Sequence, residues 1–107
     1  MAETDTPVLD LLGEMTAASI EASSLDAQTL MLVRVAALVA TDAPPVSYLL
    51  NLGAAGELGV TSEQIEGVLA AVAPIVGTPR VMSAAGKMAR AVGIAIEVSD
   101  AEAESEA

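Results

Sequence analysis

Proline, glycine and threonine lie at the ends of the apolar stretches of this chain, and these helix-boundary signals constrain the fold more than any other feature. Thr6-Pro7 pairs an N-cap residue with a proline at the first helical position, and Thr61 with Gln64 forms a capping box. Between such signals, apolar residues recur at helical spacing. The sequence therefore predicts an all-α fold, with helices over about 7–22, 26–41, 45–58, 62–76 and 79–92 and a short apolar piece over 94–98.

The core of this fold must be built from small aliphatic side chains. Hydrophobic residues make up 53% of the chain, but Tyr48 is the only aromatic residue. Small side chains bury little apolar area per residue, so a chain of this kind gains further burial by forming oligomers. The predicted helix over 26–41 contains LMLVRVAALVA, which is apolar on every side. Such a helix is expected to be buried all round, either within the domain or between subunits.

Charge and composition exclude several classes of function. The formal net charge is −11, with four basic residues, so a nucleic-acid partner is not expected. The chain has no Cys and no His, which excludes disulfides, thiolate chemistry and imidazole catalysis and predicts no metal or cofactor. The acidic start MAETDTP is unlike a signal peptide, and no uncharged stretch is long enough to span a bilayer. We therefore expect a cytoplasmic protein without a membrane partner.

Composition also divides the chain into three parts. Residues 1–6 are expected to be a flexible N-terminus, and residues 7–98 a single helical domain. The segment 99–107, SDAEAESEA, is acidic and has no apolar periodicity, so it is expected to be a disordered tail. Such a tail keeps a protein soluble, and the alternative is that it serves as a docking strip for a partner.

The segment 25–93 resembles a known family. The resemblance rests on the LDAQTLMLVRVAALVA helix, the Gly59-Val60 turn, the TSEQIEGVLAAVAPIVGTPR stretch and a final helix rich in small residues. In their order and spacing these pieces are similar to the carboxymuconolactone decarboxylase-like group, which also contains the alkylhydroperoxidase D-like proteins. The resemblance implies an all-α bundle of about five to six helices and a homo-oligomer, commonly a trimer or hexamer.

The resemblance also implies where a reactive site would lie. Enzymatic members carry a His where this chain has Asn51, and peroxidase members carry a Cys-x-x-Cys pair where it has Pro44 and Ser47. A hydroxyl cannot replace a disulfide-forming thiol, so classical peroxidase chemistry is excluded. Asn51 can form hydrogen bonds but cannot transfer a proton near neutral pH, so decarboxylase-type activity lacks its acid or base.

One polar set remains at this place. If the helices over 26–41 and 45–58 form an antiparallel hairpin that turns near Ala43, Arg34 and Asn51 lie at the same level, with Ser47 one turn nearer the loop. Arg34, Ser47 and Asn51 would then line a pocket in which the guanidinium binds the carboxylate of a small organic anion. In the alternative interpretation, Arg34 is structural and pairs with helix carbonyls or with a Glu of another subunit.

These observations leave three functional hypotheses. The first is a homo-oligomeric structural or small-organic-acid-binding module. The second is an enzyme that acts on a small carboxylated lactone or related acid, in the manner of a decarboxylase or isomerase, with Arg34 for binding and Glu57 as the catalytic base. The third is an adaptor that works through its acidic tail. Among the other cations, Arg80 is expected to pair with an acid, either Glu57 or one of another subunit. Lys87 and Arg90 are expected to lie near the end of the last helix.

Overall fold

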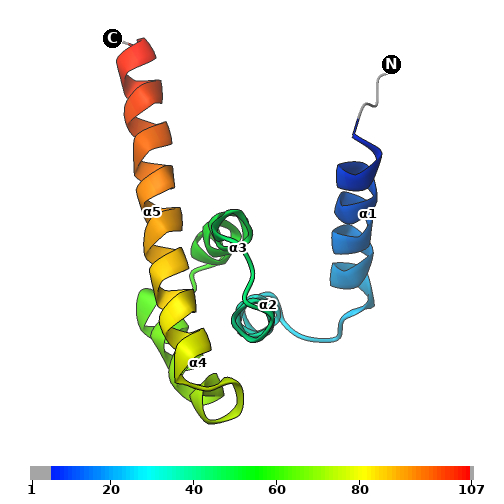
Figure 1. The fold of residues 1–107 in the computed structure, drawn as a ribbon. Helices are drawn as coiled ribbons and strands as arrows, with labels where there is room; N and C mark the ends of the chain where they lie inside the picture. Colours follow the sequence, from blue (N-terminus) through cyan, green and yellow to red (C-terminus); the bar gives the residue numbers. More distant parts are fainter. Residues whose placement is uncertain (1–5, 107) are drawn as a thin grey trace.

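The structure is a computed structural model that describes residues 6–106 and consists, over that range, of five helices without a strand (Figure 1). The predicted all-α fold is confirmed. The flexible N-terminus predicted over 1–6 lies, apart from Thr6, outside the described residues. The helices are α1 (Pro7–Ala22), α2 (Ala27–Thr41), α3 (Pro45–Glu57), α4 (Ser62–Val76) and α5 (Thr78–Glu106).

Helices α2 and α3 form the expected antiparallel hairpin, and both are seen nearly end-on in Figure 1. α2 ends at Asp42, which adopts the left-handed conformation (φ 55°) that Asp tolerates better than most residues. At the far end of the hairpin, Gln28 Nε2 donates a hydrogen bond of 2.8 Å to the carbonyl oxygen of Leu58. Each of these two residues is fifteen positions from Ala43, so the contact confirms the register predicted for the hairpin.

The core lies where α2, α3 and α5 meet, and α4 covers it. Its buried members come from all three helices and the α2–α3 turn: Val35, Val39, Ala43, Tyr48, Ala84, Met88 and Ala91. The apolar face predicted for α4 packs against this cluster, except that Ile75 is 86% exposed. The capping box of Thr61 and Gln64 is present at the start of α4. The single aromatic residue therefore lies at the centre of a core made otherwise of aliphatic side chains.

Helix α5 is much longer than the sequence predicted. The expectation was a helix that ended at Gly93 and a disordered tail from residue 99, but α5 continues through both to Glu106. A glycine inside a helix costs only about 1 kcal/mol relative to Ala, and the Ala and Glu residues that follow are strong helix formers. Local propensity therefore extends the helix where no apolar periodicity remains. None of the described helices combines the length and the apolar character that crossing a membrane requires.

Helix α1 stands away from the other four (Figure 1). It has the predicted bounds, but none of its residues is buried. α2 also differs from the expectation that it would be buried all round, because Val33 on its outer side is 52% exposed. The single chain thus leaves uncovered two apolar surfaces that the sequence pattern predicts to be covered.

Candidate functional site

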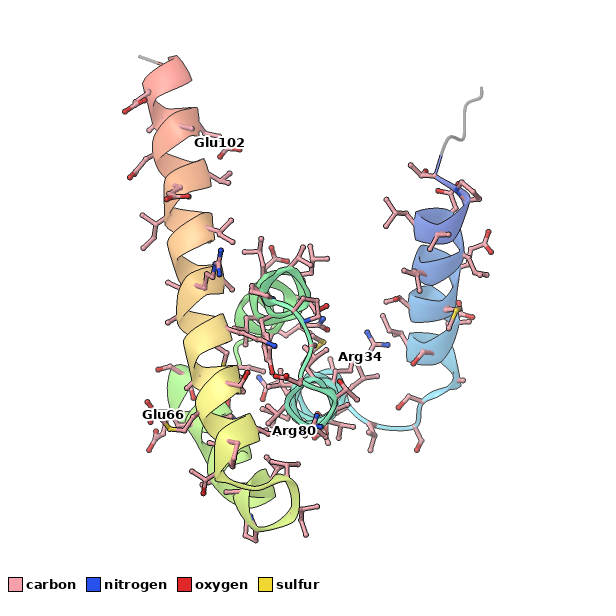
Figure 2. The ribbon with its side chains drawn as sticks, in the orientation of Figure 1. Arg34, Glu66, Arg80 and Glu102 are labelled. Carbon is pink, nitrogen blue, oxygen red and sulfur yellow. The ribbon has the colours of Figure 1, made fainter. Side chains whose placement is uncertain are left out.

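Arg34 lies in the middle of α2 and reaches towards α1 (Figure 2). Its Nη2 donates a hydrogen bond of 3.0 Å to Ser19 Oγ and a longer one of 3.4 Å to the carbonyl oxygen of Thr16. The side chain is half-buried, and no carboxylate among the described residues forms an ion pair with it. The remaining N–H groups of the guanidinium are therefore available to donate hydrogen bonds to a planar anion such as a carboxylate.

Ser47 and Asn51 lie one turn apart on α3 and are both half-buried. Asn51 Nδ2 donates a hydrogen bond of 2.9 Å to the carbonyl oxygen of Ser47. No hydrogen bond joins either residue to Arg34 within residues 6–106, because the guanidinium turns to α1 instead. The structure thus places the three residues at the predicted level of the hairpin and brings Ser47 and Asn51 together, with Arg34 directed to another helix.

Glu57 is the last residue of α3, and its side chain is exposed. The next residue, Leu58, contacts Gln28 at the start of α2. Gln28 precedes Arg34 by six residues, which is about 9 Å along the helix axis. Glu57 therefore lies beside the beginning of α2, at a different level from Arg34.

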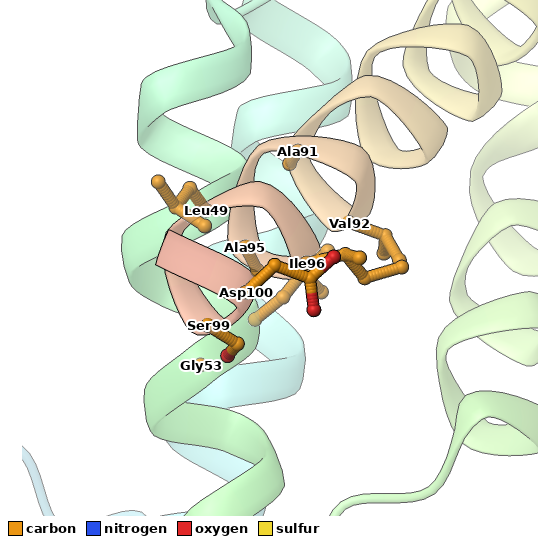
Figure 3. Close-up of a pocket in the computed structure, with 9 residues that line it drawn as sticks. Leu49, Gly53, Ala91, Val92, Ala95, Ile96, Ser99 and Asp100 are labelled. Atoms are coloured by element: carbon orange, nitrogen blue, oxygen red, sulfur yellow. The ribbon is translucent and has the colours of Figure 1, made fainter. Parts of the chain in front are cut away.

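Two apolar cavities open on the surface of the helical body. The first has a volume of about 500 Å³ and lies between α3 and the second half of α5 (Figure 3), and the second, of about 380 Å³, lies among α3, α4 and α5. Neither is lined by Arg34, Ser47, Asn51 or Glu57. The first is lined by Leu49, Leu52, Gly53, Ala91, Val92, Ala95, Ile96, Ser99 and Asp100. These two cavities are thus separate from the polar residues that the sequence singled out.

A polar cluster that the sequence analysis missed joins α5 to the α2–α3 turn. The carboxylate of Asp42 accepts hydrogen bonds from Ser83 Oγ at 2.7 Å and from Lys87 Nζ at 2.9 Å. Arg80 Nη1 donates to the carbonyl oxygen of Ala40, at 2.6 Å. The acid that was expected as the partner of Arg80 is therefore replaced by a backbone carbonyl at the C-terminal end of α2, where a cation is favourable.

The spacing of the basic and polar residues in α5 was the sequence signal that could have predicted this cluster. Arg80, Ser83 and Lys87 are three and four residues apart and so share one face of a helix. The hydrogen bond from Lys87, followed by that from Ser83, lowers the pKa of Asp42. Because α5 continues to Glu106, Lys87 lies inside the helix rather than near its end, and its role is to hold the turn.

Tyr48 is fully buried, and its hydroxyl has no hydrogen-bond partner among the described residues. Burial, and secondarily the negative charge of Asp42, raises the pKa of this phenol. A buried hydroxyl without a partner is costly, so the ring contributes packing while its oxygen opposes stability.

These elements define a small all-α domain: α4 and α5 pack against the α2–α3 hairpin, and a capping box begins α4. A family model for the carboxymuconolactone decarboxylase family matches residues 7–91. The match covers well over half of the 107 residues, and the chain therefore belongs to this family. It begins at the first residue of α1 and ends within α5, so α1 is part of the family domain. Comparisons with curated proteins and with solved structures gave no match.

Proposed function

We propose that this protein is a homo-oligomeric, small-organic-acid-binding member of the carboxymuconolactone decarboxylase family, without thiol peroxidase chemistry. Its assembly is the trimer or hexamer that the resemblance implies. The ligand is a small carboxylate, held by the guanidinium of Arg34. Ser47 and Asn51 lie at the same level of the α2–α3 hairpin, and they would contact the ligand if the guanidinium turned from α1 towards α3.

The observation that carries this proposal is the state of Arg34. It is the only charged residue of α2, it is half-buried, and a single nitrogen of its guanidinium forms hydrogen bonds with the described chain. A guanidinium removed from water gains most when a carboxylate occupies its paired donors. Ser19 orients the side chain and leaves the rest of its donor set for the ligand.

Binding is favoured over catalysis because the groups that could move a proton are absent or distant from Arg34. Position 51 holds an amide, and Glu57 is exposed and beside the start of α2. An enzyme that used Arg34 and Glu57 on one small lactone would need both side chains at one level of the hairpin.

The test is a thermal-shift and calorimetric titration of the whole protein with acetate, succinate and benzoate, and with their methyl esters as uncharged controls. A carboxylate that binds the folded state raises the melting temperature, by an amount equivalent to about 2.7 kcal/mol when its concentration is a hundred times Kd. We expect the carboxylates to bind, the esters not to bind, and Arg34→Gln to abolish binding.

Arg90→Gln is the matched control, because Arg90 is exposed and forms no hydrogen bond or ion pair with any described residue. It removes one positive charge and should leave carboxylate binding unchanged. If Arg34→Gln binds the acids as well as wild type does, or if no carboxylate binds, Arg34 is not the ligand site.

A further inference from the structure

Helix α1 has an apolar stripe that residues 6–106 of this chain leave exposed. Val8, Leu12 and Met15 lie along one side of the helix, and each is between 49% and 66% exposed. At 100° per residue, the acidic residues Asp10 and Glu14 fall on the opposite side. The stripe is therefore uncharged, although the chain as a whole has a net charge of −11.

An isolated helix of this length is marginal in water. α1 has 16 residues, contains Gly13 and has no side-chain cap on its backbone N–H groups. A helix only slightly longer than about 12–15 residues, with an internal glycine and no side-chain cap, gains little stability alone, and in proteins most helical stability comes from packing of the apolar face. Hydrogen bonds from Arg34 of α2 join α1 to the other helices, and they supply no apolar burial. Packing against another surface must therefore stabilise α1.

The stripe is turned towards the rest of the molecule. Ser19 lies on the same side of α1 as Leu12 and Met15, by helical spacing, and its hydroxyl contacts Arg34 of α2. The helical body offers exposed apolar side chains of its own on α2 and α3, namely Val33, Val46 and Leu50. The chain thus exposes both the apolar stripe of α1 and apolar side chains of α2 and α3, and within one copy the two do not bury each other.

We propose that α1 is an interface helix, and that its apolar stripe packs against the helical body of a second copy of this chain. This inference rests on the homo-oligomeric part of the proposed function and names the surface through which the copies associate. Val8, Leu12 and Met15 of the stripe, with Leu11 beside them, are each between 49% and 66% exposed, which leaves on the order of a few hundred Å² of apolar area. Together with the exposed residues of α2 and α3, this approaches the roughly 800 Å² per partner of a stable interface.

Charge favours a second copy over a membrane. Helices that lie on membranes carry Lys and Arg on the polar face, whereas the polar face of α1 carries Asp10, Glu14 and Glu21 and no cation. The acids of α1 lie away from the stripe, so two copies can meet through it without bringing these charges together.

The first test compares two substitutions on α1 that place the same residue on opposite sides. Met15→Asp puts a carboxylate in the stripe, and Ala17→Asp puts one on an exposed position about 160° further round the helix. In sedimentation velocity over a range of concentrations, we expect Met15→Asp to raise the dissociation constant of the assembly by about 100-fold or more. Ala17→Asp should change it by less than about threefold.

The second test uses the absence of cysteine from the chain. Leu12→Cys and Ala17→Cys each create a single thiol, whose rate of labelling by a maleimide reports exposure. Labelling of Leu12→Cys should slow by at least tenfold between dilute and concentrated protein, and labelling of Ala17→Cys should not change. Protection that depends on concentration shows that another copy of the chain covers the stripe.

The possible failures are distinguishable. If wild type assembles but Leu12→Cys is labelled equally at all concentrations, the copies associate through another surface, so the inference is wrong and the proposed oligomer stands. If wild type is monomeric at every concentration, both are wrong. If Met15→Asp weakens binding to phosphatidylcholine vesicles and leaves self-association unchanged, a lipid surface covers α1 and the inference is wrong. Carboxylate binding at Arg34 is measured separately by its own titration.

Discussion

Replacement of Tyr48 by Phe should stabilise the protein. The ring of Tyr48 is fully buried at the centre of the core, and its hydroxyl has no partner among the described residues. A buried polar group that lacks a hydrogen bond costs about 1–3 kcal/mol, because it has lost its water and gained nothing in return. Tyr48→Phe removes that group and keeps the ring, so we expect the free energy of unfolding to rise by about 1 kcal/mol. For a domain of this size, the melting temperature should rise by roughly 4–8 °C.

Urea and thermal unfolding of wild type and variant, at one fixed protomer concentration, measure this effect. Tyr48→Leu is the companion variant, because it removes the hydroxyl and also most of the ring. The cavity it leaves should cost about 2–4 kcal/mol, so the two variants should change stability in opposite directions. If Tyr48→Phe instead destabilises the protein by 1 kcal/mol or more, the hydroxyl has a hydrogen-bond partner and the reasoning is wrong.

The same residue provides an internal check, since Tyr48 is the only tyrosine and its absorbance titrates without interference. Burial raises the pKa of the phenol in the folded protein. The folded state then holds its proton more tightly than the unfolded state, in which the pKa is about 10. Ionisation is therefore penalised in the folded state, so this group does not change the unfolding free energy below that pH and lowers it as the pH rises through the folded pKa. Phenolate should therefore appear at higher pH in the folded protein than in the protein unfolded by urea.

Two further predictions concern the ends of the α2–α3 hairpin. Lys87 and Ser83 lower the pKa of Asp42, so its contribution to stability is present above about pH 4 and lost as the pH falls through the folded pKa. The difference in unfolding free energy between wild type and Asp42→Asn should therefore shrink as the pH is lowered below about 4, and a difference independent of pH would contradict the ion pair. Gly59 has a φ of +86°, and a Cβ there would lie 3.1 Å from Gln28 Nε2. Gly59→Ala should therefore destabilise the protein by about 1–2 kcal/mol. Gly67→Ala, at a position inside α4 where a Cβ meets no other atom, should stabilise it by up to about 1 kcal/mol. Equal effects of the two glycine substitutions in urea unfolding would show that the backbone conformation at Gly59 is not the cause.

The bounds of the first four helices could be predicted from the sequence because local chemistry determines them. Asp26 accepts the backbone N–H of Thr29 at the start of α2, and the capping box opens α4 as expected. The Pro44-Pro45 pair separates α2 from α3, since proline disfavours helix in the residue before it. These signals act within three or four residues, which is the range over which a sequence can be interpreted without knowledge of the fold.

The end of α5 could not be predicted by the same reasoning. Gly93 directly follows the helix predicted over about 79–92, but a glycine ends a helix only if the chain beyond it leaves the helical conformation. The residues that follow, IAIEVSDAEAESEA, contain no proline and are rich in Ala and Glu. Lack of apolar periodicity indicates that a segment does not pack against a core, and this is a different property from being unfolded.

At the candidate site, the position of Arg34 along the hairpin could be predicted, but the direction of its side chain could not. The hairpin register follows from the length of each helix, so the sequence could place Arg34 and Asn51 at one level. The direction of the Arg34 side chain depends on where α1 lies, and α1 is connected to α2 by a segment with no strong local signal. The sequence therefore could not indicate that Arg34 binds Ser19 rather than groups of α3.

The contacts of three of the four cations support the view that packing of α1 requires a second copy. Arg80 and Lys87 hold α5 to the end of α2 and to Asp42, at places where aliphatic side chains already pack the same helices together. Arg34 holds α1, but there no apolar packing accompanies the polar contact. Hydrogen bonds between partly exposed groups contribute only about 0.5–1.5 kcal/mol each, because water competes for them. Such contacts orient helices that apolar burial has already joined, and the described residues supply no such burial to α1, which is what the proposed interface with a second copy would provide.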